Sequence, residues 1–169
     1  MHRSGGLGVV ALVVLIALPA AAPLASQSVS AAKVTASVRR VFGGGGLADT
    51  LQLDRVTVLR ISRHDSLLGF ARVGNVKGKD QPITYLVAVD PAGRILDIDI
   101  LVYREPYGGE VAYEAWRKQF RGKDAAAPLI LGRDIRNISG ATISSNAVTV
   151  AVRRSLADFD GWRRRGLLR

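Results

Sequence analysis

The chain has 169 residues, with 24 Lys and Arg against 14 Asp and Glu, and a formal net charge of +10. This length fits one compact domain, and the scattered basic residues, not interleaved with aromatics, speak against nucleic acid as a partner. Since the sequence contains no cysteine, it excludes a cysteine nucleophile, thiolate metal sites, iron–sulfur clusters and thioether-linked haem.

The amino terminus has the pattern of an export segment. One cation, Arg3, precedes an apolar run from Leu7 to Leu18, and small residues follow, as in a signal peptide with its processing site. An uncleaved anchor is the alternative, because the run approaches the roughly 20 residues that span a bilayer. Two prolines, Pro19 and Pro23, favour cleavage. We expect residues 1–32 to be a signal peptide or N-terminal anchor, and the folded part to be periplasmic or otherwise extracytosolic.

The next elements predict a helix followed by strands. Helical spacing of apolar residues indicates a helix over Ala31–Phe42, which the glycines at 43–46 end. Strand patterns joined by residues of turn composition follow at 56–61, 67–73, 83–89 and 94–103. In the last of these, one face holds Ile95, Asp97, Asp99 and Leu101, and the other holds Leu96, Ile98, Ile100 and Val102. This alternation predicts a sheet whose apolar side packs against helices.

Two further helices complete the expected order. The first covers Glu110 to Phe120 and contains Trp116, and the second begins near Thr142. With about four strands between the helices, the order predicts an α+β fold, an antiparallel β-sheet packed with helices in a single domain. We expect that domain over residues 33–160, followed by a basic tail over residues 161–169. Trp116, Trp162 and Tyr113 are expected as core or edge aromatics.

The segment Asp134-Ile-Arg-Asn-Ile-Ser139-Gly140-Ala141-Thr142 is the most informative part of the chain. It places a hydroxyl where small residues open an amphipathic helix, whose buried face is predicted to contain Ala147, Val148, Ala151, Val152, Leu156 and Phe159. Thr142, Ser144 or Ser145 could each cap this helix. Small residues let a ligand approach the backbone, and the N–H groups of a helix start attract phosphate. As a pattern alone, the string is more often a turn with an N-cap.

A second segment, Tyr103 to Val111, ends the long strand. Gly108 and Gly109 after Tyr107 allow a sharp turn and the close approach of a flat ring. Glu105 or Glu110 could accept hydrogen bonds from a polar ring edge. The alternative is a plain strand-to-helix turn in which Glu110 favours the first helical turn.

Other chemistry has little support in the sequence. His64 beside Asp65 is a lone histidine in a polar turn, and His2 falls in the export segment, so no metal site is expected. Ser139 lacks the Gly-x-Ser-x-Gly elbow of serine hydrolases, and no histidine follows it.

The Asp134 to Thr142 segment, continued by Ile-Ser-Ser-Asn-Ala-Val148, resembles the FMN-binding domain family, and the resemblance covers roughly Val34 to Phe159. This family includes the flavin-carrying subunits of sodium-pumping quinone reductases and related electron-transport complexes. The resemblance implies that Thr142 is joined to FMN by a phosphoester bond, made by a separate flavin transferase that uses FAD and magnesium. It also implies that the transferase reads Asp134, Ser139, Gly140 and Ala141. A loop comparable to Glu105, Tyr107, Gly108, Gly109 and Glu110 borders the flavin in the family.

The expected function is that of an electron carrier and not of an enzyme with its own substrate turnover. The resemblance implies a membrane electron donor and an extracytosolic acceptor, with membrane association. The family's glutamate-threonine-proline-glycine loop is replaced here by Arg104-Glu-Pro-Tyr-Gly-Gly109. The polypeptide is also far shorter than the pump subunits. Both differences favour a stand-alone flavin carrier or a subunit of a smaller extracytosolic electron-transfer chain. The alternative is a non-redox binding or sensory module of the same fold.

Overall fold

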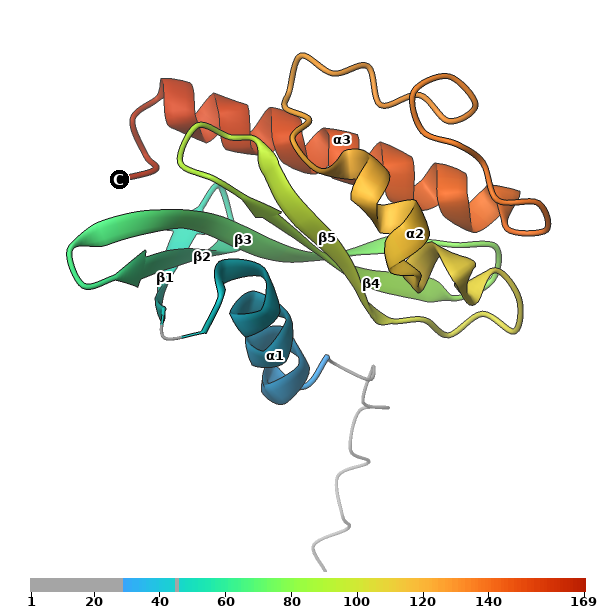
Figure 1. Cartoon of the computed structure of the whole chain (residues 1–169), viewed down its shortest axis with the longest axis horizontal. Helices are drawn as coiled ribbons and strands as arrows, with labels where there is room; N and C mark the ends of the chain where they lie inside the picture. The colour runs from blue at the N-terminus through green and yellow to red at the C-terminus, as the bar shows by residue number, and fades with distance from the viewer. Residues whose placement is uncertain (1–28, 45) are drawn as a thin grey trace, which may run out of the picture.

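The computed structural model describes residues 29–44 and 46–169, so most of the expected export segment lies outside the described residues. The elements follow the order α1 (Ala31–Phe42), β1 (Leu47–Leu53), β2 (Val56–Arg63), β3 (Ser66–Lys77), β4 (Pro82–Val89), β5 (Ile95–Val102), η1 (Gly109–Ala112), α2 (Glu114–Arg117), η2 (Lys118–Phe120) and α3 (Thr142–Arg164). Figure 1 shows α1 on one side of the sheet and α3 on the other. This confirms the predicted α+β fold.

The helix α1 has the bounds that the sequence predicts. Ser30 caps its first turn by accepting a hydrogen bond from the Lys33 N–H at 3.3 Å. The helix ends at Gly43, whose φ of 71° lies in the left-handed region. In this conformation the Gly43 N–H donates a hydrogen bond to Arg39 O. Glycine adopts this conformation without the Cβ clash that other residues suffer.

The sheet is a five-stranded antiparallel meander in the order β1-β2-β3-β4-β5. The sequence predicts about four strands, and β1 is not among them. This strand pairs with β2 from Leu47 opposite Ser62 to Leu53 opposite Val56. The tight turn between them uses Asp54 and Arg55, with φ values of 48° and 66°. Because this turn contains no glycine, the sequence lacks the usual mark of a two-residue hairpin.

Both faces of the sheet are covered. The face toward α3 packs a cluster that includes Phe70, Val87, Ile98, Val152 and Phe159. The face toward α1 packs a smaller cluster that includes Val38, Phe42, Ile61, Leu86 and Leu101. The predicted buried face of α3 is confirmed at Val148, Ala151, Val152, Leu156 and Phe159, while Ala147 is half-buried. Trp116 and Trp162 are buried, whereas Tyr113 is exposed.

The predicted faces of β5 hold for the aspartates but not for Ile95. Asp97 pairs with Ala88 and Asp99 pairs with Leu86 on the α1 side. A register irregularity between Ala88 and Val89 places Ile95 opposite Val89, and Ile95 joins the cluster on the α3 side instead. A β-bulge of this kind interrupts the two-residue alternation.

The continuous helix expected from Glu110 to Phe120 is wrong. Tyr113 has extended backbone angles (φ −71°, ψ 137°) and separates η1 from α2. The interrupted segment covers the edge of β5, because Arg117 donates a hydrogen bond to Ile98 O. The chain that follows adds backbone bonds from Gly122 N–H to Ile95 O at 2.7 Å and from Ile95 N–H to Lys123 O at 2.8 Å. These edge contacts replace the regular helix.

A buried charge cluster joins α1 to β5 and to the segment after it. Asp97 is 3% exposed and lies 2.6 Å from Arg40, 3.4 Å from Arg117 and 3.3 Å from Arg121. Burial by itself raises the pKa of Asp97. The hydrogen bonds and charges of these arginines lower that pKa by more than burial raises it, so the net shift is downward. Ser37 of α1 adds a hydrogen bond to Asp99 at 2.7 Å.

Candidate functional site

Thr142 is the first residue of α3, and no side chain caps this helix. Ala141 occupies the N-cap position with φ −121° and ψ 24°. The expectation that Thr142, Ser144 or Ser145 caps the helix is therefore wrong. Two of these hydroxyls have other partners: Thr142 Oγ1 accepts a hydrogen bond from Asn137 Nδ2 at 2.9 Å, and Ser144 Oγ lies 2.8 Å from Tyr103 Oη. The Ser145 hydroxyl is buried and has no hydrogen-bond partner among the described residues.

The turn before Thr142 leaves its hydroxyl accessible. Ser139, Gly140 and Thr142 are exposed, while Ala141 is 3% exposed and anchors the turn. The Ala141 N–H donates to Ile138 O at 3.0 Å. Gly140 has a φ of 81°, and a Cβ placed on it would meet no atom within 4 Å. The backbone in front of Thr142 is thus open to a bulky group.

The loop that ends β5 packs against this helix start. A Cβ on Gly108 would come within 2.7 Å of Tyr103 Oη, 3.2 Å of Ser144 Oγ and 3.3 Å of Ala141 Cβ. Tyr103 Oη also donates to Tyr107 O at 2.5 Å. Burial raises the pKa of the Tyr103 phenol, and the negative charges of Glu105 and Glu110 add to that rise. Tyr103 therefore stays protonated and fixes the loop to the first turn of α3.

Two cavities flank the loop. One, of about 440 Å³, is lined by Lys79, Asp80, Glu105, Pro106, Tyr107, Gly140, Ala141, Thr142, Ile143 and Ser144. The other, of about 360 Å³, is lined by Tyr103, Glu105, Pro106, Tyr107, Gly108, Gly109, Glu110, Tyr113 and Gly140. Both volumes lie within the range of roughly 300–1,000 Å³ that is usual for small-molecule sites. Tyr107, 83% exposed, belongs to the lining of both.

Two of the predicted site residues, Ser139 and Asp134, line neither cavity. Ser139 lies in the exposed turn, and Asp134 belongs to a neighbouring loop. The Asp134 carboxylate accepts hydrogen bonds from the N–H groups of Leu129 at 3.0 Å and Ile130 at 2.6 Å. Burial tends to raise the pKa of Asp134, but these N–H groups and the charge of Lys123 outweigh it, so the pKa is lowered. Asp134 thus stabilises, through these hydrogen bonds, the loop that leads to Thr142.

Glu105 also has a local role. Its Oε1 accepts from the N–H groups of Asp80 at 2.8 Å and Gln81 at 3.0 Å. The bond from Gln81 is the largest cause of the lowered pKa of Glu105. The carboxylate therefore ties the β5 loop to the β3–β4 turn and remains ionised. Glu110 is exposed at the rim of the second cavity.

Lys79 and the hydroxyl contacts of Tyr103 are parts of the site that the sequence does not predict. Lys79 comes from the β3–β4 turn, about sixty residues before Thr142 in the chain, and supplies the cation of the larger cavity. Its turn, Gly78-Lys-Asp-Gln-Pro82, has the composition of an ordinary hairpin loop. Only the pairing of β3 with β4 and of β4 with β5 brings that turn to the end of β5.

These residues fit a phosphate-bearing planar ligand. A helix leaves its first N–H groups without intrahelical acceptors, and no side chain caps those of α3. These groups and Lys79 favour an anion beside Thr142. The exposed Tyr107 and the glycine backbone at Gly108, Gly109 and Gly140 give a flat ring room to lie against the loop.

Comparisons with known proteins agree with this fit. Residues 78–157 match the model of the family described as FMN-binding domain. The chain is also 33% identical over 87 residues to one of the subunits of the proton-translocating ferredoxin:NAD(+) oxidoreductase complex of Clostridium ljungdahlii. That match covers 47% of this chain and 47% of the relative, so the chain spans about half the length of the relative it matches. Residues 78–157, which contain both cavity-lining segments and Thr142, are therefore similar to the FMN-binding domain family.

Proposed function

We propose that the protein is an exported electron carrier with FMN joined to Thr142 through a phosphoester bond. The observation that carries the proposal is the exposed Thr142 hydroxyl, which stands at an uncapped helix start and opens onto a cavity of about 440 Å³. The likeness to part of a ferredoxin:NAD(+) oxidoreductase complex supports a place in a membrane-associated electron-transfer chain. Bound FMN supplies one- and two-electron chemistry.

The attachment needs an external enzyme, a flavin transferase using FAD and magnesium. Thr142 Oγ1 attacks the FMN phosphorus of FAD, the new O–P bond forms as the diphosphate bond breaks, AMP leaves, and the hydroxyl proton passes to a base of the transferase. Asn137 holds the Thr142 oxygen from one side through its amide at 2.9 Å. The uncapped N–H groups of α3 and Lys79 then stabilise the negative phosphoester.

The remaining residues position the flavin. Gly108 lets the β5 loop approach the first turn of α3, and Tyr103 fixes that approach through Ser144. Tyr107 offers an exposed aromatic surface on which a ring can stack. A membrane donor and an extracytosolic acceptor would then exchange electrons at the open side of the cavity.

Intact-mass measurement tests the attachment. The protein is coexpressed with a flavin transferase, and the wild type is expected to gain the mass of one FMN less one water and to stay yellow after denaturation. Thr142→Ala should gain nothing. Thr35→Ala, which changes an exposed threonine of α1, serves as the matched control and should load like the wild type. Flavin retained by Thr142→Ala, or no adduct on the wild type, would overturn the proposal.

A redox titration tests electron carriage separately. The loaded protein should be reduced and reoxidised reversibly, without change in its mass. A loaded protein whose flavin cannot be reduced by any low-potential donor contradicts the carrier function but leaves the attachment intact, and points to the non-redox binding or sensory alternative.

A further inference from the structure

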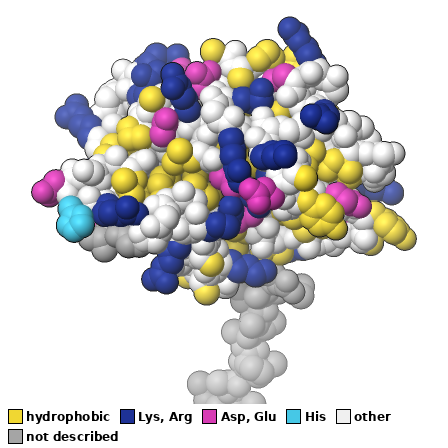
Figure 2. All heavy atoms as spheres, in the orientation of Figure 1, with side chains coloured by type: hydrophobic (Ala, Val, Ile, Leu, Met, Phe, Trp, Pro, Cys, Tyr) yellow, Lys and Arg dark blue, Asp and Glu magenta, His cyan; other side chains and the backbone are white. Residues whose placement is uncertain are grey.

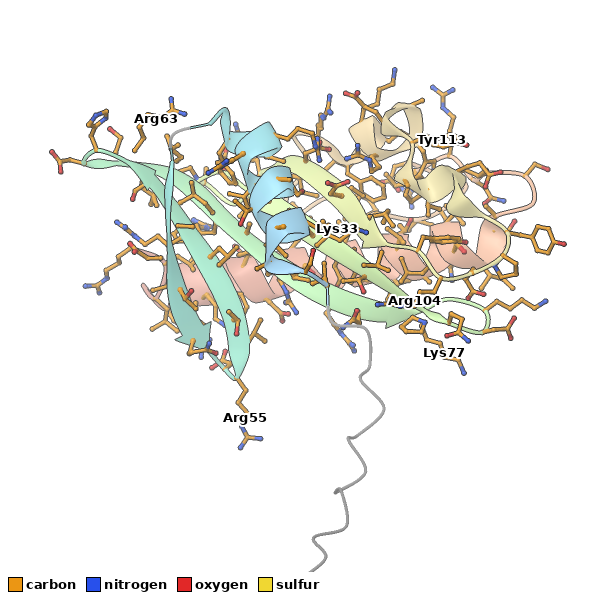
Figure 3. The ribbon with its side chains drawn as sticks, turned by 90° about the horizontal axis from the view of Figure 1, so that it is seen from below. Lys33, Arg55, Arg63, Lys77, Arg104 and Tyr113 are labelled. Atoms are coloured by element: carbon orange, nitrogen blue, oxygen red, sulfur yellow. The ribbon has the colours of Figure 1, made fainter. Side chains whose placement is uncertain are left out.

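The side of the sheet that α1 covers carries several cations without acidic partners. We call Lys33, Arg39, Arg63 and Lys77 the basic α1 face. None of the four forms an ion pair within residues 29–44 and 46–169. Figure 3 shows Lys33, Arg63 and Lys77 on the side from which α1 is seen in front of the sheet. The face is therefore positive without local neutralisation.

Each of these residues has a defined place on that side. Lys33 and Arg39 are exposed on α1, and Lys33 Nζ donates to Leu101 O at 3.4 Å. The Arg63 guanidinium donates to the carbonyls of Phe42, Gly43 and Gly44 at the end of α1. Lys77 ends β3 in register with Ala71 and Val73, which pack on the α1 side. At this strand end Lys77 also borders a cavity lined by Thr142 and Asn146 of α3.

The acidic residues under α1 do not cancel this charge. Asp97 and Asp99 are both held by Arg40 and Arg117, at distances of 2.6 to 3.6 Å. The helix α1 contains no acidic residue. Asp80 and Glu105 lie at the rim in the candidate site, where backbone N–H groups hold the Glu105 carboxylate. Elsewhere Figure 2 shows Lys and Arg side chains with Asp and Glu side chains among them.

The chain also enters the fold on this face. Val29 is followed by the N-cap residue Ser30 at the start of α1. In the sequence, ten residues separate Val29 from the end of the apolar run at Leu18. Ten residues reach at most roughly 35 Å when extended. If that run occupies a bilayer, α1 is held near the membrane surface by its amino-terminal end.

We propose that the basic α1 face lies on the surface of an anionic phospholipid bilayer. Clusters of Lys and Arg next to an apolar segment bind anionic lipid headgroups through charge, and this binding weakens as salt rises. In this orientation the sheet stands between the lipid and α3, so the α3 layer with Thr142 faces away from the membrane. The proposal does not depend on FMN attachment, and Thr142→Ala should bind vesicles like the wild type.

Vesicle flotation tests the surface with the full chain. Vesicles of phosphatidylcholine alone are compared with vesicles of equal parts phosphatidylcholine and phosphatidylglycerol, which separates charge binding from any insertion of the apolar run. The triple variant Lys33→Glu, Arg39→Glu, Lys77→Glu should lose the anionic preference by at least about tenfold. The matched control Arg133→Glu, Arg153→Glu, Arg154→Glu reverses three exposed cations elsewhere and should lose less than about threefold. Equal losses in both triples would overturn the proposal.

Because the chain has no cysteine, a single introduced thiol can report the orientation. Thr35→Cys lies on the exposed side of α1, and Ala157→Cys lies on the exposed side of α3. With a polarity-sensitive fluorophore, Thr35→Cys should shift to the blue on anionic vesicles and return at high salt, while Ala157→Cys stays unchanged. A shift at Ala157→Cys alone contradicts the orientation. Binding of polyglutamate, but not of vesicles, through the basic α1 face would assign the surface to an acidic protein and overturn the lipid proposal.

Discussion

The Tyr103 hydroxyl lies 2.8 Å from the Ser144 hydroxyl and joins the loop after β5 to the first turn of α3. These residues are 41 positions apart in the sequence. The bond holds the two halves of the candidate site together, since Thr142 begins the same turn.

Tyr103→Phe should weaken the contact between the β5 loop and α3 without creating a cavity in the core. The change removes the bonds to Ser144 Oγ and Tyr107 O, and we expect the free energy of unfolding to fall by about 1 kcal/mol and flavin loading to slow. Urea denaturation and intact mass measure the two effects. Tyr113→Phe removes an exposed hydroxyl and should leave the free energy of unfolding unchanged. Unchanged loading in Tyr103→Phe would show that the bond does not position the loop.

Gly108→Ala should damage the site through crowding. Its added Cβ would lie 2.7 Å from Tyr103 Oη, and its φ of 88° is unfavourable for alanine. Gly122→Ala is the matched control, because Gly122 has a φ of 77° and no atom within 4 Å of an added Cβ. We expect Gly122→Ala to cost about 1 kcal/mol and Gly108→Ala to cost more, with loss of flavin loading. Equal unfolding free energies for the two variants would contradict the close approach.

Asp97→Asn should destabilise the protein by about 3 kcal/mol, because it leaves the buried Arg117 guanidinium with Asp99, at 3.6 Å, as its remaining carboxylate partner. The lowered pKa of Asp97 also sets the pH dependence. A group whose pKa is lower in the folded state stabilises the fold above its unfolded pKa of about 3.9, and that stability is lost as pH falls through the folded value. Wild-type stability should therefore decline below about pH 4 more steeply than that of Asp97→Asn.

Denaturant titrations across this acidic range measure the difference. Asp49→Asn is the control, because the Asp49 side chain is 69% exposed and its ion pair with Arg60 is long, at 3.7 Å. It should cost no more than about 1 kcal/mol. Parallel pH profiles for the wild type and Asp97→Asn would refute the role given to this carboxylate.

Asp134→Ala should act through the loop that precedes Thr142. Without the carboxylate, the Leu129 and Ile130 N–H groups lose their acceptor, and we expect faster hydrogen exchange at both amides and slower flavin loading. Asp124→Ala, which removes an acceptor for the Ala126 N–H at 3.0 Å, should speed exchange only at its own turn. If loading falls while exchange at Leu129 and Ile130 is unchanged, Asp134 contacts the transferase directly.

The sequence predicts best what local patterns determine. The bounds of α1 follow from its apolar spacing and the glycines after it, and the β4–β5 hairpin follows from strand alternation around residues 90–93. The strand β1 was missed because its turn lacks glycine. The break at Tyr113 was missed because contacts with the edge of β5 override helical spacing.

For the site, the sequence predicts the two segments but not their geometry. Thr142 and the glycines after Tyr107 have recognisable local patterns, and the structure brings them together through Gly108. Lys79 and the Tyr103–Ser144 bond come from segments far apart in the chain. Their part in the site depends on strand register, which a single sequence leaves open.

The strand order has a consequence for how the chain acquires its structure. In a meander every strand pairs with its neighbour in sequence, so the hairpins form from nearby residues. The helix α1 comes first in the chain, yet it docks by bringing Arg40 to Asp97, 57 positions later. The ion pairs that complete its docking therefore need β5 in place. The helix α1, although first in the chain, thus gains its Arg40–Asp97 contact only when β5, the last strand, has formed.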